Sequence, residues 1–207
     1  MFKALLCDMG GVLVHFNHDA YERGLAELLK PLPLSLVQGI TRGEKWHKLL
    51  VEFETGAIND ERFITGLETL FDRPLPRKAY WTTVHTGRDI MRVDEVAVDI
   101  LRRVKRKHPN LAVTLVSNVD PFVLKFCVDG MDFRFDHVVP SFRVRSYKPD
   151  TFIYKAALTE SGVVATNAMF WDDRAENVRA AKDLNICAYR FTDVQAMERV
   201  LEGFELL

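Results

Sequence analysis

The sequence predicts an α/β fold, a doubly wound parallel sheet with a Rossmann-like core and a helical segment inserted after the first strand. Short and nearly continuous apolar runs recur along the chain, which is typical of parallel strands covered on both faces. Stretches with apolar residues at helical spacing separate most of these runs, and alternating strands and helices define the doubly wound class. Between residues 15 and 88 the alternation stops and only helical patterns occur.

Five apolar runs are expected to form the strands, and most end in polar or glycine-rich residues. The first run stops at Asp8, which is followed by two glycines. The second stops at Ser117 and Asn118, and the fourth at the pair Asp172 and Asp173. The expected strands are residues 2–7, 111–116, 136–139, 168–171 and 186–190.

The core helices are expected between and after these strands, each with an apolar stripe on one face. A stripe from Val93 to Val104 predicts a helix before the second strand. Asp150 follows a proline and is a suitable N-cap for a helix that begins directly after it. Two further stripes predict helices over residues 178–184 and 194–204.

The inserted segment, residues 15–88, is expected to form a helical cap domain, with 1–14 and 89–207 as the α/β core. Prolines and glycines divide it into short helices, one of which begins after Asn59 and Asp60. An insertion after the carboxyl end of the first strand would lie over the crevice in which α/β sheets bind ligands. We therefore expect this segment to act as a lid.

Composition indicates an ordinary soluble globular protein. Among its 207 residues 48% are hydrophobic and 28% are charged, which argues against disorder. Lys and Arg (28) balance Asp and Glu (29), so the net charge of -1 gives no general attraction to nucleic acid or anionic membranes. No apolar run approaches the roughly 18 residues of a transmembrane helix, and the apolar start lacks a signal-peptide cleavage site. We expect a cytoplasmic protein with neither nucleic acid nor membrane as a partner; its oligomeric state is left open.

Several other features are not assigned to chemistry. Cys7, Cys127 and Cys187 are widely spaced and form no metal-binding cluster, so we expect reduced, packed thiols without a catalytic role. The basic run over 102–107 lies in an expected amphipathic helix and is interpreted as its solvated face.

The polar residues at the expected strand ends form the candidate site, because the carboxyl ends of parallel strands meet at one edge of a sheet. They are Asp8, Ser117, Asn118, Asp172 and Asp173. Three carboxylates in one crevice repel one another unless a cation compensates them. Mg²⁺ is the natural cation because it binds carboxylate and carbonyl oxygens. Lys148, in a loop before a helix, lies on the same side, and such a site would also attract phosphate.

Each of these residues has a functional and a structural interpretation. Asp8 could form an aspartyl-phosphate as a nucleophile, or it could be a turn residue, although an acid at the end of a buried strand is costly without a purpose. Gly10 and Gly11 let the backbone turn sharply and approach a small ligand. Lys148 could neutralise the nucleophile and the transferring phosphoryl group, or it could be a surface lysine.

The second and fourth strand ends allow two interpretations as well. Ser117 and Asn118 could bind phosphate oxygens or simply begin a loop. Asp172 and Asp173 could cap the following helix, but a double acid at a strand end is hard to explain without a metal or a cationic partner. Asn177 would lie one helical turn beyond Asp173 and is expected to orient it.

These motifs, in this order, resemble those of the haloacid dehalogenase-like hydrolases. The matching residues are Asp8-Met9-Gly10-Gly11-Val12-Leu13, Ser117-Asn118, Lys148-Pro149, and Asp172-Asp173 with Asn177. The resemblance spans residues 2 to about 190 and places the insertion where that family has a helical cap. The stretch Phe53-Glu54-x-Gly56-x-Ile58 and the Gly-Gly-Val-Leu form of the first motif are most similar to the sugar-phosphate phosphatase branch, which also includes the phosphatase domain of soluble epoxide hydrolases.

The resemblance implies a magnesium-dependent phosphatase that hydrolyses a small phosphomonoester, with a sugar phosphate as one candidate, through an aspartyl-phosphate. Asp8 would be the nucleophile and Lys148 would stabilise the phosphate. The implied phosphate-binding residues are Gly11, Ser117, Asn118 and Lys148. The implied Mg²⁺ ligands are Asp8, the Gly10 carbonyl and Asp173, with Asp172 and Asn177 in support.

One position departs from the family pattern. Most phosphatases of the superfamily have a second Asp as acid and base where this chain has Gly10, although a glycine also occurs there in the sugar-phosphate phosphatase branch. Loss of an acid/base residue lowers the rate roughly 10²–10⁴-fold unless another group replaces it. His15, His18 and His47 in the insertion are candidate replacements. Two alternatives therefore stay open: a 2-haloacid dehalogenase in which Asp8 attacks carbon without a metal, and a catalytically weak binding or regulatory homologue.

Overall fold

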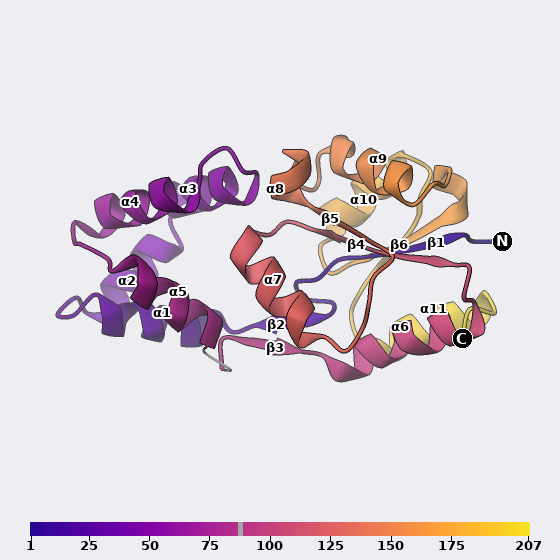
Figure 1. The fold of residues 1–207 in the computed structure, drawn as a ribbon, viewed down its shortest axis with the longest axis horizontal. Helices are drawn as coiled ribbons and strands as arrows, with labels where there is room; N and C mark the ends of the chain where they lie inside the picture. Colours follow the sequence, from indigo (N-terminus) through magenta and orange to yellow (C-terminus); the bar gives the residue numbers. More distant parts are fainter. Residues whose placement is uncertain (87–88) are drawn as a thin grey trace.

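A five-stranded parallel sheet forms the centre of the computed structural model, which describes residues 1–86 and 89–207 (Figure 1). Its strand order is β5-β4-β1-β6-β7, and every neighbouring pair is parallel. The strands are β1 (Ala4–Cys7), β4 (Ala112–Ser117), β5 (His137–Pro140), β6 (Ala168–Asp172) and β7 (Cys187–Arg190). All five strands expected from the apolar runs are present, which confirms the predicted fold class.

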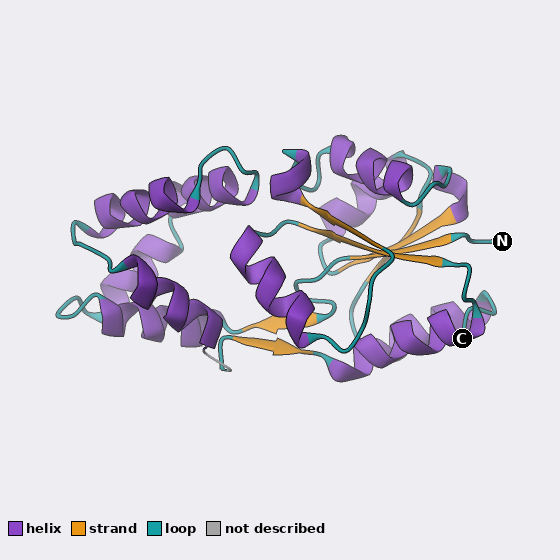
Figure 2. Ribbon diagram, viewed as in Figure 1, coloured by secondary structure: helices purple, strands orange, loops and turns teal. Residues whose placement is uncertain are grey.

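Helices cover both faces of this sheet (Figure 2). Leu5 and Cys7 of β1 pack into a hydrophobic cluster with α6 and α11, whereas Ala4 and Leu6 pack into a second cluster with α9 and α10. Because successive strand residues point to opposite faces and both faces are covered, the strand sequences are continuously apolar. The four helices are α6 (Glu95–Lys107), α9 (Thr151–Glu160), α10 (Ala175–Asp183) and α11 (Val194–Gly203).

The strand order creates a crevice at the carboxyl ends of the strands. From β1 the sheet extends through β4 to β5 on one side and through β6 to β7 on the other. Ligands of doubly wound folds bind where the strand order reverses in this way. The residues that follow β1, β4 and β6 are therefore brought to one edge of the sheet.

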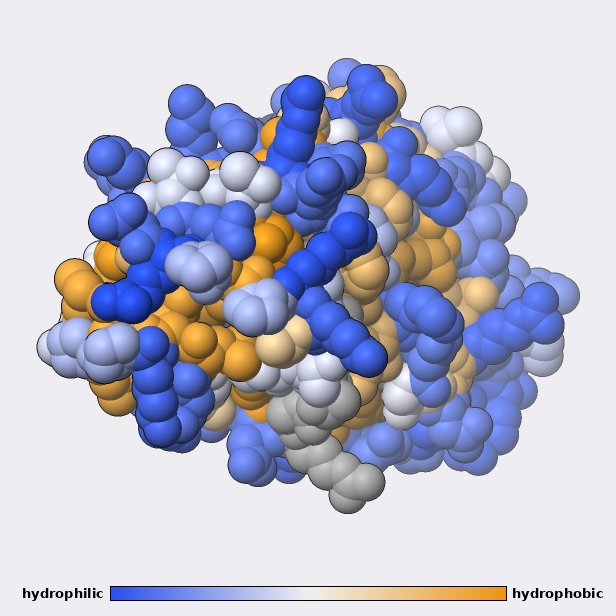
Figure 3. Space-filling view, turned by 60° about the vertical axis from the view of Figure 1, so that its left-hand side comes forward, coloured by the Kyte–Doolittle hydropathy of each residue, from blue (hydrophilic) through white to orange (hydrophobic). Residues whose placement is uncertain are grey.

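A helical cap follows β1 and lies at the left in Figure 1. Its helices are α1 (His18–Leu28), α2 (Leu34–Thr41), α3 (Glu44–Glu54), α4 (Asp60–Phe71) and α5 (Arg77–Thr86). Aromatic rings fill its interior; Phe53 and Phe63 stack with ring centroids 4.4 Å apart. Figure 3 brings this side forward and shows apolar surface interrupted by hydrophilic side chains. The expected helical cap is present, while its expected end, residue 88, lies outside the described residues.

A short antiparallel ribbon that the sequence did not predict joins the cap to the core. It consists of β2 (Val14–Phe16) and β3 (Met91–Val93), with Val93 paired to Val14. The assignment of Val93 to a helical stripe was therefore wrong, because α6 begins only after its N-cap, Asp94. Val96 was also assigned to that stripe and is 60% exposed. Strands of three residues are too short to show an alternating pattern.

Two further helices were not expected from the sequence. They are α7 (Pro121–Gly130) and α8 (Ser141–Val144). The carboxylate of Asp120 caps α7 by accepting hydrogen bonds from the main-chain N–H groups of Phe122 and Val123. Within the described ranges, no helix is long and apolar enough to cross a membrane.

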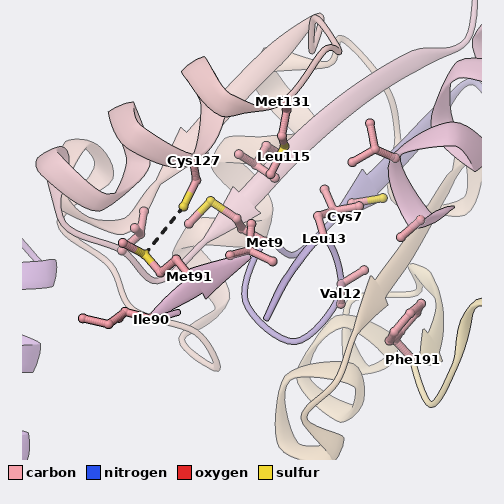
Figure 4. Close-up of a cluster of buried hydrophobic side chains, with 14 of the residues drawn as sticks. Cys7, Met9, Val12, Leu13, Ile90, Met91, Leu115, Cys127, Met131 and Phe191 are labelled. Carbon is pink, nitrogen blue, oxygen red and sulfur yellow. Dashed lines mark hydrogen bonds between the residues drawn. The ribbon is translucent and has the colours of Figure 1, made fainter. Parts of the chain in front are cut away.

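The loop after β1 is anchored by an apolar, sulfur-rich cluster (Figure 4). Cys127 of α7 is buried, and its thiol lies 3.9 Å from the sulfur of Met91. Burial raises the pKa of Cys127 to about 12 and that of Cys7 well above its ordinary value. Both are free thiols, as is the half-buried Cys187, which fits the expectation of packed, unreactive cysteines. Val12 and Leu13 of the loop are fully buried, so they anchor the main chain that follows Gly11.

Candidate active site

Four charged side chains meet where β1 and β6 end. The ammonium of Lys148 lies 2.7 Å from Asp8 Oδ1 and 2.7 Å from Asp172 Oδ2. Asp8, Asp172 and Asp173 each bring one carboxylate oxygen to within 4.8 Å of the others. The structure thus brings together the acids that the sequence placed at separate strand ends and the lysine that it placed in a loop before a helix.

Asp8 stands directly after β1, and its main-chain N–H donates to the carbonyl of Trp171, which extends the strand pairing by one residue. Its Oδ1 accepts a hydrogen bond from the N–H of Met9 at 2.7 Å. Burial raises the pKa of Asp8 to about 7, against the opposing effect of Lys148, and the charge of Asp172 raises it further. The charged form of Asp8 therefore depends on nearby positive charge, which Lys148 supplies.

Lys148 is 2% exposed, so the alternative of a surface lysine is wrong. Asn118 clamps its main chain: Asn118 Oδ1 accepts from the Lys148 N–H at 2.7 Å, and Asn118 Nδ2 donates to the Lys148 carbonyl at 3.0 Å. Burial alone would lower the pKa of Lys148, but Asp8 and Asp172 overcome this effect and raise it above its ordinary value. Lys148 is thus a fixed positive charge. Both amide atoms of Asn118 are engaged, so its expected contact with phosphate falls to its main chain.

Asp172 is fully buried and surrounded by donors. It accepts from Lys148, from the Arg174 N–H at 2.9 Å, and from Asn177 Nδ2 at 2.9 and 3.0 Å. The expectation that Asn177 orients Asp173 was therefore wrong. Because α10 begins only at Ala175, Asp173 lies outside the helix and helical spacing does not relate it to Asn177. Asp172 thus holds Lys148 in place.

Asp173 is half-buried and packs against the glycine loop. Gly11 has a φ of +72°, and a Cβ atom built there would lie 2.5 Å from Asp173 Oδ2. Only glycine satisfies both the positive φ and this approach. At Gly10, by contrast, an added Cβ would meet nothing within 4 Å. Burial raises the pKa of Asp173, and the charge of Asp172 adds to this effect.

The donor set fits Mg²⁺. Asp8 and Asp173 present carboxylate oxygens to the same point, and both carboxylates are destabilised by burial and by a neighbouring acid. Hard oxygen ligands of this kind are those that Mg²⁺ prefers, and it usually takes one or two carboxylates. The oxygens of Asp172 already accept several hydrogen bonds, so this residue would orient its neighbours and not bind the metal directly.

A cavity of about 890 Å³ opens between this cluster and the cap. On the core side Asp8, Ser117 and Lys148 line it, and Ser117 is 2% exposed at the end of β4. The cap contributes aromatic, aliphatic and polar side chains, among them Trp46, Leu50, His47, Tyr80 and Trp81. A volume of this size lies within the usual range of small-molecule sites.

Three acids that line the cavity, Glu22, Asp120 and Glu54, were not among the predicted site residues. Asp120 is buried at the N-terminus of α7, and burial raises its pKa to about 6. Glu54 ends α3; burial raises its pKa to about 8, and the charges of Asp120 and Asp8 add to this effect. The pair Asp120-Pro121 is a recognisable start of a helix, so it could have indicated α7 and its capping acid. In the sequence, Glu54 was noted only within the stretch Phe53-Glu54-x-Gly56-x-Ile58, and no chemical role was predicted for it.

The three candidate replacements for the missing acid, His15, His18 and His47, also line the cavity. His15 belongs to β2, His18 to α1 and His47 to α3. His15 Nε2 is 2.8 Å from Asp94 Oδ2, which ties this ring to the start of α6. Trp46 is 8% exposed and packs between Tyr21 and Phe71, so it combines packing with cavity lining.

Residues 2–185 match the haloacid dehalogenase-like hydrolase family. The chain belongs to this family of hydrolases, as the order of its motifs predicted. The match spans the cap and all of the site residues described above. The family match therefore agrees with the observed fold, which has a Rossmann-like core and a cap after β1.

Individual proteins similar to this chain include two phosphatases. The chain is 27% identical over 197 residues to a D-ribitol-5-phosphate phosphatase from Bacteroides thetaiotaomicron, with 89% of each chain covered. It is 27% identical to a sesquiterpene phosphatase from Aspergillus oryzae, over 93% of this chain and 91% of that protein. In structure it is similar to a HAD family enzyme from Bacteroides thetaiotaomicron, solved in complex with magnesium and inorganic phosphate. That match has a TM-score of 0.76 and 20% identity, and covers 93% of this chain and 95% of that one.

Proposed function

We propose that this protein is a magnesium-dependent phosphatase that hydrolyses a small phosphomonoester through an aspartyl-phosphate on Asp8. The observation that carries the proposal is the convergence of Asp8, Lys148 and Asp173 on one cavity at the carboxyl ends of the strands. The two phosphatases named above, each 27% identical to this chain, support it.

Phosphate recognition would rest on local groups, since the net charge is only -1. The buried ammonium of Lys148 and the hydroxyl of Ser117 face the cavity and would bind phosphate oxygens, together with main-chain N–H groups at Gly11 and Asn118. Mg²⁺ held by Asp8, the Gly10 carbonyl and Asp173 would supply the remaining positive charge. Preorganised donors of this kind stabilise the charge of phosphoryl transfer strongly.

The reaction would proceed in two displacements. The free carboxylate oxygen of Asp8 attacks phosphorus in line, and the bond between phosphorus and the leaving oxygen breaks. Water then attacks the phosphorus of the aspartyl-phosphate, which releases inorganic phosphate and restores Asp8. Throughout, Lys148 would neutralise charge on the phosphoryl group. Asp172 keeps Lys148 in position, and Asn177 in turn donates a hydrogen bond to Asp172.

The cavity supports two classes of organic group on the phosphate. Its polar lining, which includes Glu54, Asp120 and His47, and the ribitol-phosphate phosphatase relative favour a sugar or polyol phosphate. Its aromatic lining, which includes Trp46 and Trp81, and the sesquiterpene phosphatase relative favour a terpenyl or similar apolar monoester. We place the sugar and polyol phosphates first because the charges of Asp8 and Asp120 both act on Glu54, so polar groups of the lining lie near the nucleophile.

A panel of phosphomonoesters, assayed with Mg²⁺ and with a chelator, tests the proposal. Release of inorganic phosphate by the wild type, lost on chelation and in Asp8→Asn, is the expected result. Turnover that survives Asp8→Asn would contradict the role of Asp8. Metal-independent halide release from 2-haloacids would instead indicate a dehalogenase, and binding of orthovanadate without any turnover would indicate a binding homologue.

A further inference from the structure

We infer that Glu54, supplied by the cap, is the acid/base catalyst that the first motif lacks at Gly10. The inference rests on the proposed phosphatase function and names the group that would protonate the leaving oxygen. It follows from where Glu54 lies, from how it is fixed to the core, and from which groups surround its carboxyl.

Glu54 lies on the wall of the cavity that contains the nucleophile. Asp8, Lys148 and Glu54 all line this cavity. Tyr147, the residue directly before Lys148, also lines the cavity, and its side chain opposes the rise in the pKa of Glu54. Asp8 is close enough for its charge to raise the pKa of Glu54. Glu54, at the end of a cap helix, therefore lines the same cavity as the nucleophile.

The position of Glu54 is fixed by the core although it belongs to the cap. The Ser141 hydroxyl, at the start of α8, donates to the main-chain carbonyl of Glu54. Two residues on, Gly56 has a φ of +68°, and a Cβ atom there would lie 2.7 Å from the carbonyl oxygen of Phe142. The end of α3 thus rests directly on α8, as Figure 1 shows. The main chain at Glu54 is therefore anchored to the core.

The surroundings of Glu54 keep its carboxyl protonated and ready to donate. Burial and two neighbouring acids, Asp120 and Asp8, disfavour its charged form, and the pKa of about 8 follows. The two neighbouring acids come from the N-cap of α7 (Asp120) and from the loop after β1 (Asp8), and the neutral side chain of Tyr147 acts in the opposite sense. A general acid works best when its pKa lies near the working pH.

Two other titratable groups of the cavity, Asp120 and His15, have partners elsewhere. The Oδ1 atom of Asp120 accepts two main-chain hydrogen bonds at the start of α7. His15 is tied to Asp94. Glu54, by contrast, has a carboxyl whose pKa is raised by burial, and the charge of the nucleophile Asp8 adds to this effect.

Proton transfers through Glu54 balance both displacements. In the first, Asp8 forms the new bond to phosphorus, the ester oxygen leaves with the bonding pair, and Glu54 gives that oxygen its proton. In the second, Glu54 takes a proton from the attacking water, the bond between phosphorus and Asp8 breaks, and Glu54 is protonated again. No further reactant is needed.

The test compares two esters that differ in how much they need an acid. An alkyl phosphomonoester leaves as a basic alkoxide and requires a proton, whereas p-nitrophenyl phosphate leaves as a stable phenolate and does not. Glu54→Gln is expected to lower kcat/KM for the alkyl ester roughly 10²–10⁴-fold, and kcat/KM for the aryl ester less than about tenfold. Because the second step still lacks its base, the aryl ester should show a burst of one nitrophenolate per enzyme.

Glu52→Gln, on the same helix but outside the lining of the cavity, is the matched control and should behave as wild type. Glu54→Asp keeps an acid one methylene further back and is expected to recover part of the activity on the alkyl ester. Circular dichroism and orthovanadate binding check that each variant folds. If Glu54→Gln does not fold, Glu54→Asp carries the same comparison of the two esters.

Equal loss on both esters without a burst, or no loss at all, would overturn the role of Glu54 while the proposed function stands. Failure of the proposed function looks different, because Asp8→Asn would then retain turnover with either ester.

Discussion

Gly11 shows how a single residue determines the geometry of the site. Its φ of +72° and the 2.5 Å separation of an added Cβ from Asp173 Oδ2 mean that a side chain would displace a candidate metal ligand. Gly11→Ala is therefore expected to raise the Mg²⁺ concentration for half-maximal activity by about 10–100-fold, the usual effect of disturbing a metal ligand's support. A magnesium titration of phosphatase activity measures this.

Gly162 provides the control for backbone strain. It has a φ of +65°, but nothing lies within 4 Å of an added Cβ. Gly162→Ala should lower stability through strain alone and leave the magnesium requirement unchanged. An unchanged requirement in Gly11→Ala as well would contradict the close packing of Gly11 on Asp173.

Most of the site's residues could be identified from the sequence, but their partners could not. Asp8, Lys148 and Asp173 meet as expected, since strand ends converge whatever the details of the loops. Asn177 was paired with the wrong acid because the sequence does not show that α10 begins only after Asp173. Glu54 reaches the site from the cap, and no local pattern indicates a contact between α3 and the core.

At the scale of elements, the junction of α1 and α2 depends on one buried acid. Glu22 of α1 is 3% exposed and accepts from Gln38, Thr41 and Arg42. Hydrogen bonds from Arg42, then from the other donors, lower the pKa of Glu22 against the effect of burial. Its charged form thus stabilises the folded cap.

The sign of this effect predicts a pH dependence of stability. A carboxyl whose pKa is lowered by folding stabilises fully above its unfolded pKa of about 4.3, and the stabilisation is lost as the pH falls through the folded value. Glu22→Gln is expected to be less stable than wild type at pH 7, and this difference should shrink on acidification below about pH 4. Urea denaturation at a series of pH values measures both effects.

Glu27→Gln is the matched control on the same helix, because its side chain is 69% exposed in an ion pair with Lys30. Exposed pairs of this kind contribute little, so this variant should follow the wild type. A constant difference between Glu22→Gln and wild type across the acid range would contradict the electrostatic role of Glu22.

Elements with an apolar run or stripe were predicted, whereas the short β2–β3 ribbon and the helices α7 and α8 were not. The five strands and the helices α6, α9, α10 and α11 follow from buried runs or stripes. The β2–β3 ribbon has strands of three residues, which carry no period. The start of α7 is set by its N-cap and proline, not by an apolar stripe.

At the scale of the whole molecule, a net charge of -1 means that ligand binding depends on the cluster of acids and its cations. Without Mg²⁺, Asp8 and Asp173 lie close together, and burial raises the pKa of each. Binding of Mg²⁺ to the folded state alone should stabilise the protein by about 2.7 kcal/mol at 100 times Kd, which amounts to several degrees in Tm for a chain of this size.

Thermal melts with Mg²⁺ and with a chelator measure this stabilisation. Asp173→Asn is expected to lose most of the magnesium-dependent rise in Tm, because one carboxylate of the site is gone. Asp183→Asn, an exposed position at the end of α10, should keep it. An equal rise in Asp173→Asn and wild type would place the magnesium elsewhere.

The most direct test of the proposed mechanism is to trap the covalent intermediate. The protein is mixed with a substrate from the phosphomonoester panel in the presence of Mg²⁺, quenched with acid, digested and analysed by mass spectrometry. A phosphorylated peptide that carries the modification on Asp8, and that is absent from Asp8→Asn, is the predicted result. Rapid turnover in wild type with no phosphorylation of Asp8, or undiminished turnover in Asp8→Asn, would contradict it.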